Sequence, residues 1–202
     1  MSKRVYISAD YDLSNGDREV VNELNKWGRD AWHKVDFVDM SEVVSGSVAN
    51  GDDCRICDLK AEFNRQINAS SAAIFVVGDM TGSRTAGSGC ERAFKDQGQC
   101  TCTPYKQNTK GIKLCKVVST STPGENEDCG NINGYSYLRH EFEQAKKRKK
   151  AIIIVYNSTR KETSWLPSYM NGYEDYAKPF WKYDAYGRKV GDYAYIKEVL
   201  GF

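Results

Sequence analysis

Residues 136–155 read SYLRHEFEQAKKRKKAIIIV, and this stretch predicts a helix that runs almost directly into a buried strand. Apolar residues recur in its first half at the three- and four-residue spacing of a helix face, namely Leu138, Phe142 and Ala145. Ser136 is a suitable N-cap, and the basic residues that follow lie where cations stabilise a helix end. The run of β-branched residues at 151–155 is typical of a parallel strand covered by helices on both faces.

Further apolar segments extend this pattern along the chain. Short strands are predicted at residues 4–8, 35–38, 72–77 and 179–183, and helices at 17–32, 54–68 and 192–200. Strands that alternate with helices favour an α/β fold, here a flavodoxin-like doubly wound parallel sheet of about five strands. We expect one domain spanning residues 1–202, with a Cys-rich insertion at about 82–135.

The insertion separates the strand at 72–77 from the helix that begins near residue 136. It is rich in Gly, Thr, Ser, Asn and Cys, and residues 111–118 alternate as an exposed hairpin strand would. A connection of this length inside a compact domain is either functional or stabilised locally.

Composition and charge exclude several classes of partner. The net charge is +2 with both signs mixed along the chain, so a nucleic acid partner is not expected. No run of 18 or more apolar residues occurs, and the first residues, MSKR, lead into a strand rather than a signal peptide. We therefore expect a cytoplasmic protein with no membrane partner.

The sequence contains seven cysteines, and they leave three interpretations open. Without a signal peptide, ordinary reduced thiols are favoured over a disulfide framework. A structural zinc site would need four thiolates, for which the candidates are Cys90, Cys100, Cys102 and Cys115. Disulfides formed during purification are the third option. The Cys54-x-x-Cys57 pair lacks the neighbouring partner pair or preceding strand that a zinc or redox motif requires.

Three segments in series carry a family resemblance: residues 4–12 (RVYISADYD), 70–81 (SSAAIFVVGDMT) and 136–145 (SYLRHEFEQA). They resemble the TIR-like proteins of bacteria, including the Thoeris antiphage sensor. That family has a strand ending in Phe-Ile-Ser with an acidic, aromatic turn, a strand ending in Gly-Asn-Thr, and a helix with a catalytic glutamate. Glu141 matches that glutamate. Two departures are Asp79 in place of the usual Asn and the long insertion before the glutamate helix.

The resemblance implies an NAD-processing enzyme, a nucleosidase or ADP-ribose cyclase of antiviral defence. It would cleave the nicotinamide–ribose bond and produce an ADP-ribose-type signal, linear or cyclic, for a downstream effector. NAD is then a substrate, and no cofactor is expected. A non-catalytic TIR-like module that binds a protein or nucleotide is the alternative, and homo-oligomerisation stays open.

The candidate site residues follow strand ends, where parallel α/β folds place ligands. Ser8, Asp10 and Tyr11 follow the first strand, Asp79 follows another, and these four are the predicted substrate-binding residues. Asp and Ser also satisfy backbone donors in ordinary turns, which is an equally good explanation of the first group. From spacing alone Glu141 is a surface acid near a helix start, and the resemblance favours catalysis.

Overall fold

A computed structural model describes residues 3–10, 16–30, 35–39, 55–84, 107–108, 111–112 and 136–202. For residues 55–61, 107–108 and 111–112 the description covers the backbone alone. Within the predicted insertion, Gln107–Asn108 (β4) pairs antiparallel with Gly111–Ile112 (β5). The rest of the strand predicted at 111–118 lies outside the described residues.

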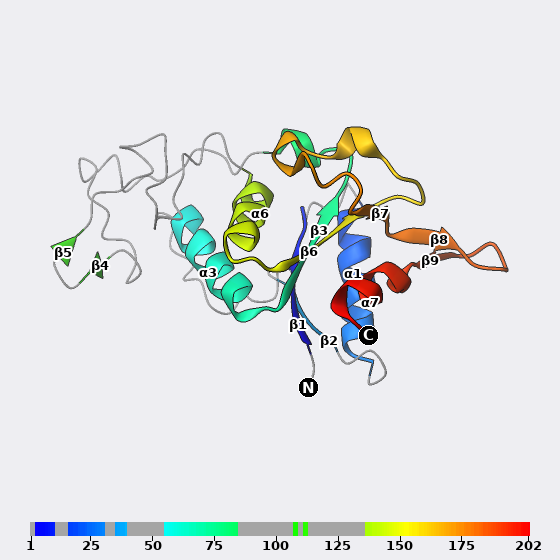
Figure 1. Cartoon of the computed structure of the whole chain (residues 1–202), viewed down its shortest axis with the longest axis horizontal. Coiled ribbons are helices and arrows are strands. Elements are labelled where there is room, and N and C mark those ends of the chain that lie inside the picture. The colour runs from blue at the N-terminus through cyan, green and yellow to red at the C-terminus, as the bar shows by residue number, and fades with distance from the viewer. Residues whose placement is uncertain are drawn as a thin grey trace.

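A five-stranded sheet in the order β2-β1-β3-β6-β7 forms the centre of the fold, and all four neighbouring pairs are parallel (Figure 1). The strands are β1 (Lys3–Ser8), β2 (Val35–Asp39), β3 (Ala72–Val77), β6 (Ala151–Tyr156) and β7 (Ala177–Pro179). This strand order is that of a doubly wound, flavodoxin-like fold, which confirms the predicted fold class.

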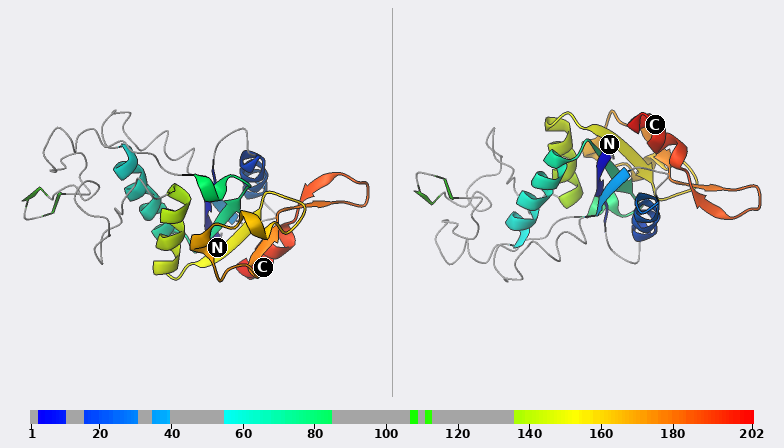
Figure 2. Two further views of the ribbon diagram at one scale, coloured as in Figure 1. Left: turned by 90° about the horizontal axis from the view of Figure 1, so that it is seen from above. Right: turned by 90° about the horizontal axis from the view of Figure 1, so that it is seen from below.

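Helices cover both faces of this sheet. On one face lie α1 (Asp17–Gly28) and α7 (Tyr193–Leu200), and on the other lie α3 (Arg55–Ala69) and α6 (Tyr137–Lys147) (Figures 1 and 2). Helix α1 ends at Gly28, earlier than the predicted residue 32, and glycine is a poor residue for continuing a helix. Helix α7 ends as predicted, with Gly201 in the left-handed conformation.

The core consists of two apolar layers, one on each face of the sheet, and alternate residues of a strand belong to opposite layers. In β3, Ile74 and Val76 pack with the layer under α1 and α7, whereas Phe75 and Val77 pack with the layer under α3 and α6. All six residues of β3 are buried, as expected of a central parallel strand.

The predicted last strand at 179–183 divides between two sheets. Pro179 pairs with Tyr156, the final residue of β6, and this is the last pair of the central sheet in this part of the chain. The chain then forms β8 (Trp181–Tyr183), which pairs antiparallel with β9 (Lys189–Gly191) in a projecting hairpin (Figure 1). The prediction of a single strand was therefore wrong at this point.

Helix α6 is positioned by its cap and by one aromatic residue. The Oγ atom of Ser136 accepts a hydrogen bond from the backbone N–H of Arg139 at 3.0 Å, which confirms the predicted N-cap. The fully buried ring of Phe142 lies edge-on to Phe75, with 5.3 Å between ring centroids, and to Tyr173, with 5.1 Å. These contacts fix the helix against the sheet.

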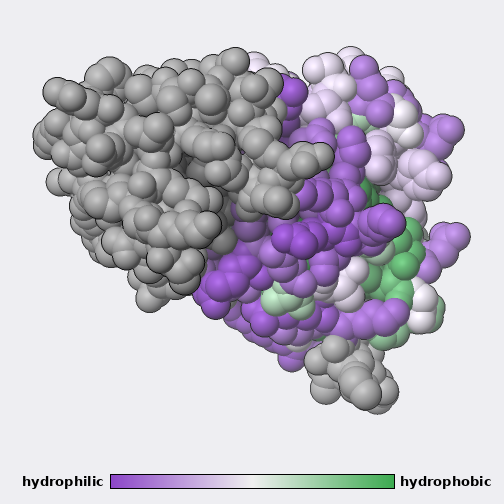
Figure 3. Space-filling view, turned by 60° about the vertical axis from the view of Figure 1, so that its left-hand side comes forward, coloured by the Kyte–Doolittle hydropathy of each residue, from purple (hydrophilic) through white to green (hydrophobic). Residues whose placement is uncertain are grey.

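The surface is largely hydrophilic over the described part of the face in Figure 3. Among the described residues, no helix combines the length and apolar character needed to span a membrane.

Phe142→Ala should lower the free energy of unfolding by ~3–5 kcal/mol, because it leaves a cavity between α6 and the sheet. The matched control is Glu143→Ala on the exposed face of the same helix, which should change stability by no more than ~0.5 kcal/mol. Urea unfolding followed by circular dichroism measures both. Equal losses for the two variants would contradict this packing.

Candidate functional site

Glu141 lies where α6 passes the carboxyl end of the sheet, and it is buried. Only 5% of the residue is exposed, and it sits on the same helix as the core residues Leu138 and Phe142. Ser8, the last residue of β1, is fully buried, and its side chain and that of Tyr6 lie near enough to Glu141 to lower the pKa of its carboxyl group. The structure therefore brings together two predicted site residues, Ser8 and Glu141, that are far apart in the sequence.

Burial controls the ionisation of Glu141. Removal of the carboxyl group from water raises its pKa from 4.5 to about 8, because the charged form loses hydration. Hydrogen bonding by Ser8 and Tyr6 acts in the opposite direction but is outweighed. At neutral pH the carboxyl group is therefore mainly protonated and can donate a hydrogen bond.

Two buried tyrosines lie near the strand ends, one of them close to Glu141, and the sequence did not identify them as site residues. Burial raises the pKa of Tyr169 to about 12, with hydrogen bonding from Ser136 and the Glu141 charge as smaller influences. Tyr169 therefore remains a neutral phenol beside the start of α6. The Tyr156 hydroxyl, at the end of β6, is also buried, and the charges that act on it are those of Glu162 and Glu174 rather than Glu141. Their position at a strand end or in a short helical turn gave no pattern that distinguishes them from core aromatic residues.

A second buried carboxyl group, that of Asp17, lies on the opposite face of the sheet at the start of α1. Asp17 is fully buried, and its Oδ1 atom accepts a hydrogen bond from Asn157 Nδ2 at 3.1 Å. Asn157 Oδ1 in turn accepts from Trp181 Nε1 at 3.1 Å. A chain of hydrogen bonds therefore joins α1, the end of β6 and the base of the β8–β9 hairpin.

Burial raises the pKa of Asp17 from 3.8 to about 7, and the negative charges of Asp10 and Asp79 raise it further. The Asn157 bond and the backbone N–H of Asp10 lower it. A Cβ atom added to Gly78 would lie 2.7 Å from Asp17 Oδ1, so only glycine fits there. The sequence indicated Gly16-Asp17 only as a helix start and gave no sign of this network.

The other predicted site residues group with Asp17 rather than with Glu141. Asp10 forms an ion pair with Arg84, with 2.6 Å between Oδ2 and Nε, and its charge acts on Asp17. Asp79 is exposed after β3 and also acts on Asp17. Tyr11 lies outside the described residues. The polar residues at the strand ends therefore form two groups, one on each face of the sheet. Ser8 belongs with Glu141, whereas Asp10 and Asp79 belong with Asp17.

The predicted zinc ligands Cys90, Cys100, Cys102 and Cys115 all lie outside the described residues, so the zinc site stays a prediction. Within the described part of the chain, no group of three or more His, Cys, Asp or Glu side chains is arranged to hold a metal ion. Two surface hollows, one along α1 and one between β7, β8 and α7, are not lined by Glu141.

No family model, curated protein or solved structure matches the chain.

The free energy of unfolding should fall as pH rises from about 4.5 to about 8, owing to Glu141. In this range the unfolded chain has released the Glu141 proton while the folded protein retains it, so deprotonation favours unfolding. Glu141→Gln should reduce this slope, which approaches ~1.4 kcal/mol per pH unit for one fully coupled group. Denaturant titrations across the range measure it.

Glu143→Gln is the control, because Glu143 is exposed on the same helix, and it should keep the wild-type slope. An unchanged slope in Glu141→Gln would show that the Glu141 carboxyl group titrates normally in the folded protein. Asp17→Asn should reduce the slope independently, at the lower end of the same pH range.

Proposed function

We propose that the chain is a TIR-like, NAD-processing enzyme that cleaves the nicotinamide–ribose bond and produces an ADP-ribose-type signal in antiphage defence. The observation that supports this most is the position of Glu141. It lies on the helix that carries the family motif, buried against Ser8 at the carboxyl end of β1. Ligands of doubly wound folds bind at this edge, where the strand order reverses between β1 and β3.

In the proposed reaction the bond between ribose C1′ and the nicotinamide nitrogen breaks. Nicotinamide leaves as a neutral base with the bonding electron pair, and positive charge develops on the ribose as an oxocarbenium-like centre. Water then adds at C1′ and releases a proton, or a nucleophilic group of the same ADP-ribose closes a ring. An ionised Glu141 beside the ribose would stabilise the developing charge, because opposite charges attract strongly in a water-poor site.

Because the pKa of Glu141 is high, we expect the bound substrate itself to ionise the carboxyl group. The carboxyl group without substrate is mainly protonated at neutral pH. The nicotinamide ring of NAD is positively charged, and a cation placed close to a carboxyl group favours its ionised form. Binding of NAD would therefore generate the carboxylate that the reaction needs. The neutral Tyr169 phenol, near Glu141, could donate a hydrogen bond to a ribose hydroxyl.

One observation favours the alternative, a non-catalytic TIR-like module that binds a protein or nucleotide. With 5% of its residue exposed, Glu141 offers little surface to a ligand, and a protonated carboxyl group enclosed by tyrosines is compatible with a purely structural role. Asp79, which stands where the family has Asn, is compatible with the same alternative.

Glu141→Gln should lower the rate of nicotinamide release from NAD by roughly 100-fold or more, because the neutral amide cannot stabilise the developing positive charge. The assay uses purified protein with NAD, with and without a phage trigger, and separates products by chromatography. Glu143→Gln, which removes the same charge from the exposed face of α6, should keep wild-type activity.

Activity that survives in Glu141→Gln would remove Glu141 from the mechanism. If the wild type releases no nicotinamide with or without the phage trigger but binds NAD in calorimetry, the binding-module alternative is supported. Absence of both release and binding would contradict both forms of the proposal for NAD.

The value of kcat/KM should rise with pH through a limb near pH 8, because this quantity follows the ionisation of Glu141 in the free enzyme. The limb for kcat should lie at lower pH, since bound NAD lowers the pKa of the carboxyl group. Initial rates at limiting and saturating NAD measure the two limbs. Coincident limbs would exclude activation of the carboxyl group by the substrate cation.

A further inference from the structure

The connection between β6 and β7 crosses the carboxyl end of the sheet beside α6. It comprises residues 157–176, includes two short helical turns at Thr163–Trp165 and Ser168–Met170, and is drawn in yellow to orange in Figure 1. Met170 is fully buried. Four further residues are partly buried against the core layer under α3 and α6, namely Trp165, Leu166, Tyr169 and Tyr173. We call residues 157–176 the β6–β7 cover.

The β6–β7 cover lies over the part of α6 that carries Glu141. The centroids of the Tyr169 and Phe142 rings are 6.0 Å apart, and the Arg139 guanidinium lies 5.8 Å from the Tyr169 centroid. These two α6 residues stand on either side of Glu141 in the sequence, and the Glu141 charge acts on the Tyr169 hydroxyl. Because Glu141 is only 5% exposed, close contact between a ligand and its carboxyl group requires a neighbouring element to move.

The backbone of the β6–β7 cover is anchored at its ends and held only by local bonds between them. Each backbone–backbone hydrogen bond described for residues 162–176 joins two residues three positions apart, such as Met170 N–H to Pro167 O at 2.8 Å. At the start of the cover Asn157 N–H donates to Val77 O at 2.9 Å, and at its end the chain enters β7. Local bonds move with their segment, so the middle of the cover can shift as a unit. Strand β1, another described neighbour of Glu141, is instead paired on both sides.

The closed position of the cover is held mainly by packing and carries a polar cost. The ion pair between Lys161 Nζ and Asp175 Oδ1 spans 3.9 Å and has a fully exposed aspartate, so it contributes little. The Tyr156 hydroxyl, where the cover begins, is buried and forms no hydrogen bond with any described residue. The charges of Glu162 and Glu174, both in the cover, act on this hydroxyl. A buried hydroxyl without a partner destabilises the closed position and gains water when the cover lifts.

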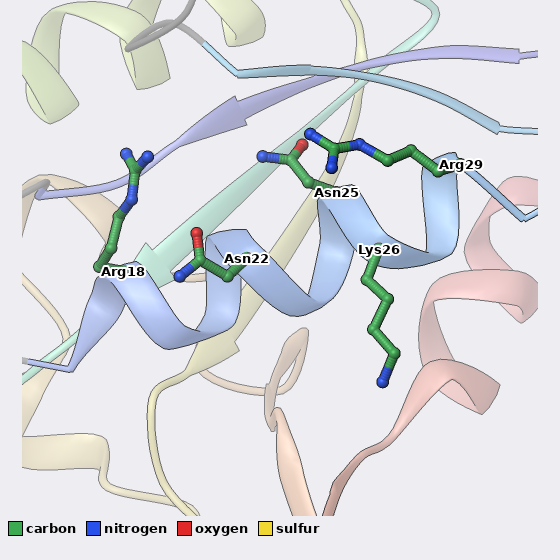
Figure 4. Close-up of a pocket in the computed structure, with 5 residues that line it drawn as sticks. All are labelled: Arg18, Asn22, Asn25, Lys26 and Arg29. Carbon is green, nitrogen blue, oxygen red and sulfur yellow. The ribbon is translucent and has the colours of Figure 1, made fainter.

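The two surface hollows offer no second route to Glu141. The hollow along α1, whose lining residues are labelled in Figure 4, lies on the opposite face of the sheet. Helix α7, which lines the other hollow, covers that same opposite face. Among the described elements, the β6–β7 cover is therefore the wall that a ligand has to displace.

We propose that the β6–β7 cover is a lid that opens to admit a ligand to Glu141 and closes again around it. The inference rests on the proposed function, because it takes Glu141 as the group that meets the substrate. An open cover lets the ligand and water reach the carboxyl group. A closed cover excludes water, and the charges that develop during the reaction then interact more strongly with Glu141.

Chemical labelling of Glu141 in the full chain tests the lid without requiring NAD cleavage. A water-soluble carbodiimide activates a protonated carboxyl group, glycine ethyl ester forms an amide with it, and the carbodiimide leaves as a urea. The tryptic peptide of residues 140–146 contains both Glu141 and the exposed Glu143, so fragment mass spectrometry gives the ratio of their labelling rates. At about pH 5.5 an opened Glu141 should react like Glu143, and the ratio then measures the open fraction.

In the wild type the ratio of Glu141 to Glu143 labelling should lie below about 0.1, because the cover is mostly closed. Tyr169→Ala should raise the ratio at least about tenfold, because it removes the ring that packs over α6 beside Glu141. Tyr156→Phe should lower it about fivefold, because it removes the unpaired hydroxyl from the closed state. Tyr186→Ala, at a residue 85% exposed on the β8–β9 hairpin, is the control and should leave the ratio unchanged.

A wild-type ratio close to one, or an unchanged ratio in folded Tyr169→Ala, would overturn the lid. A ratio that rises steeply with small additions of urea would do the same, because it marks global unfolding rather than a local opening. Should Tyr169→Ala fail to fold by circular dichroism, Tyr156→Phe decides. If the variants shift the ratio as expected while NAD neither changes it nor is cleaved, the lid stands and the proposed substrate is wrong.

Discussion

The central strands β3 and β6 are parallel neighbours, and the need to cover them on both faces governs the rest of the structure. A parallel pair cannot be joined by a tight turn, so each connection crosses the sheet, and the helices within these connections supply the cover. Alternate residues of β3 therefore belong to two separate apolar layers. The same geometry directs the carboxyl ends of β1, β3 and β6 to one edge, where the chain changes from apolar to polar residues.

That edge holds two buried carboxyl groups, one on each face of the sheet. Glu141 lies beside Ser8 and Tyr6, and Asp17 lies against Gly78 and Asn157. Each has a raised pKa because the apolar layers exclude water from it. Burial of an ionisable group reduces stability at neutral pH, so a core that retains two of them is unusual unless they serve the ligand or the positioning of strand ends.

The two carboxyl groups differ in what surrounds them. Asp17 belongs to a hydrogen-bonded chain that ends at Trp181 and links three elements. This structural role explains why its carboxyl group is buried. Glu141 lies near the hydroxyl groups of Ser8 and Tyr6, on the helix whose sequence resembles the TIR-like motif, and it has no such structural explanation.

The amino-acid pattern by itself determined the type and order of the main elements. The spacing of Leu138, Phe142 and Ala145 specified a helix, and the β-branched run after it specified a buried strand, because both signals arise from neighbours a few residues apart. The sequence also predicted that Ser8 and Glu141 lie at one edge of the sheet, because parallel strands end at the same edge. Neither their contact nor the burial of Glu141 could be deduced from local pattern.

Only the tertiary structure decided which polar residues meet. Asp17 and Asn157 are 140 positions apart, and their hydrogen bond depends on how α1 and β6 pack, which no local spacing encodes. Trp181 pairs with Gly191 in the β8–β9 hairpin rather than with the central sheet, and this choice of partner is not encoded in the local sequence. The raised pKa values of Glu141 and Asp17 likewise follow from the exclusion of water by residues distant in sequence. Sequence spacing sets local structure, whereas burial and ionisation depend on the assembled layers.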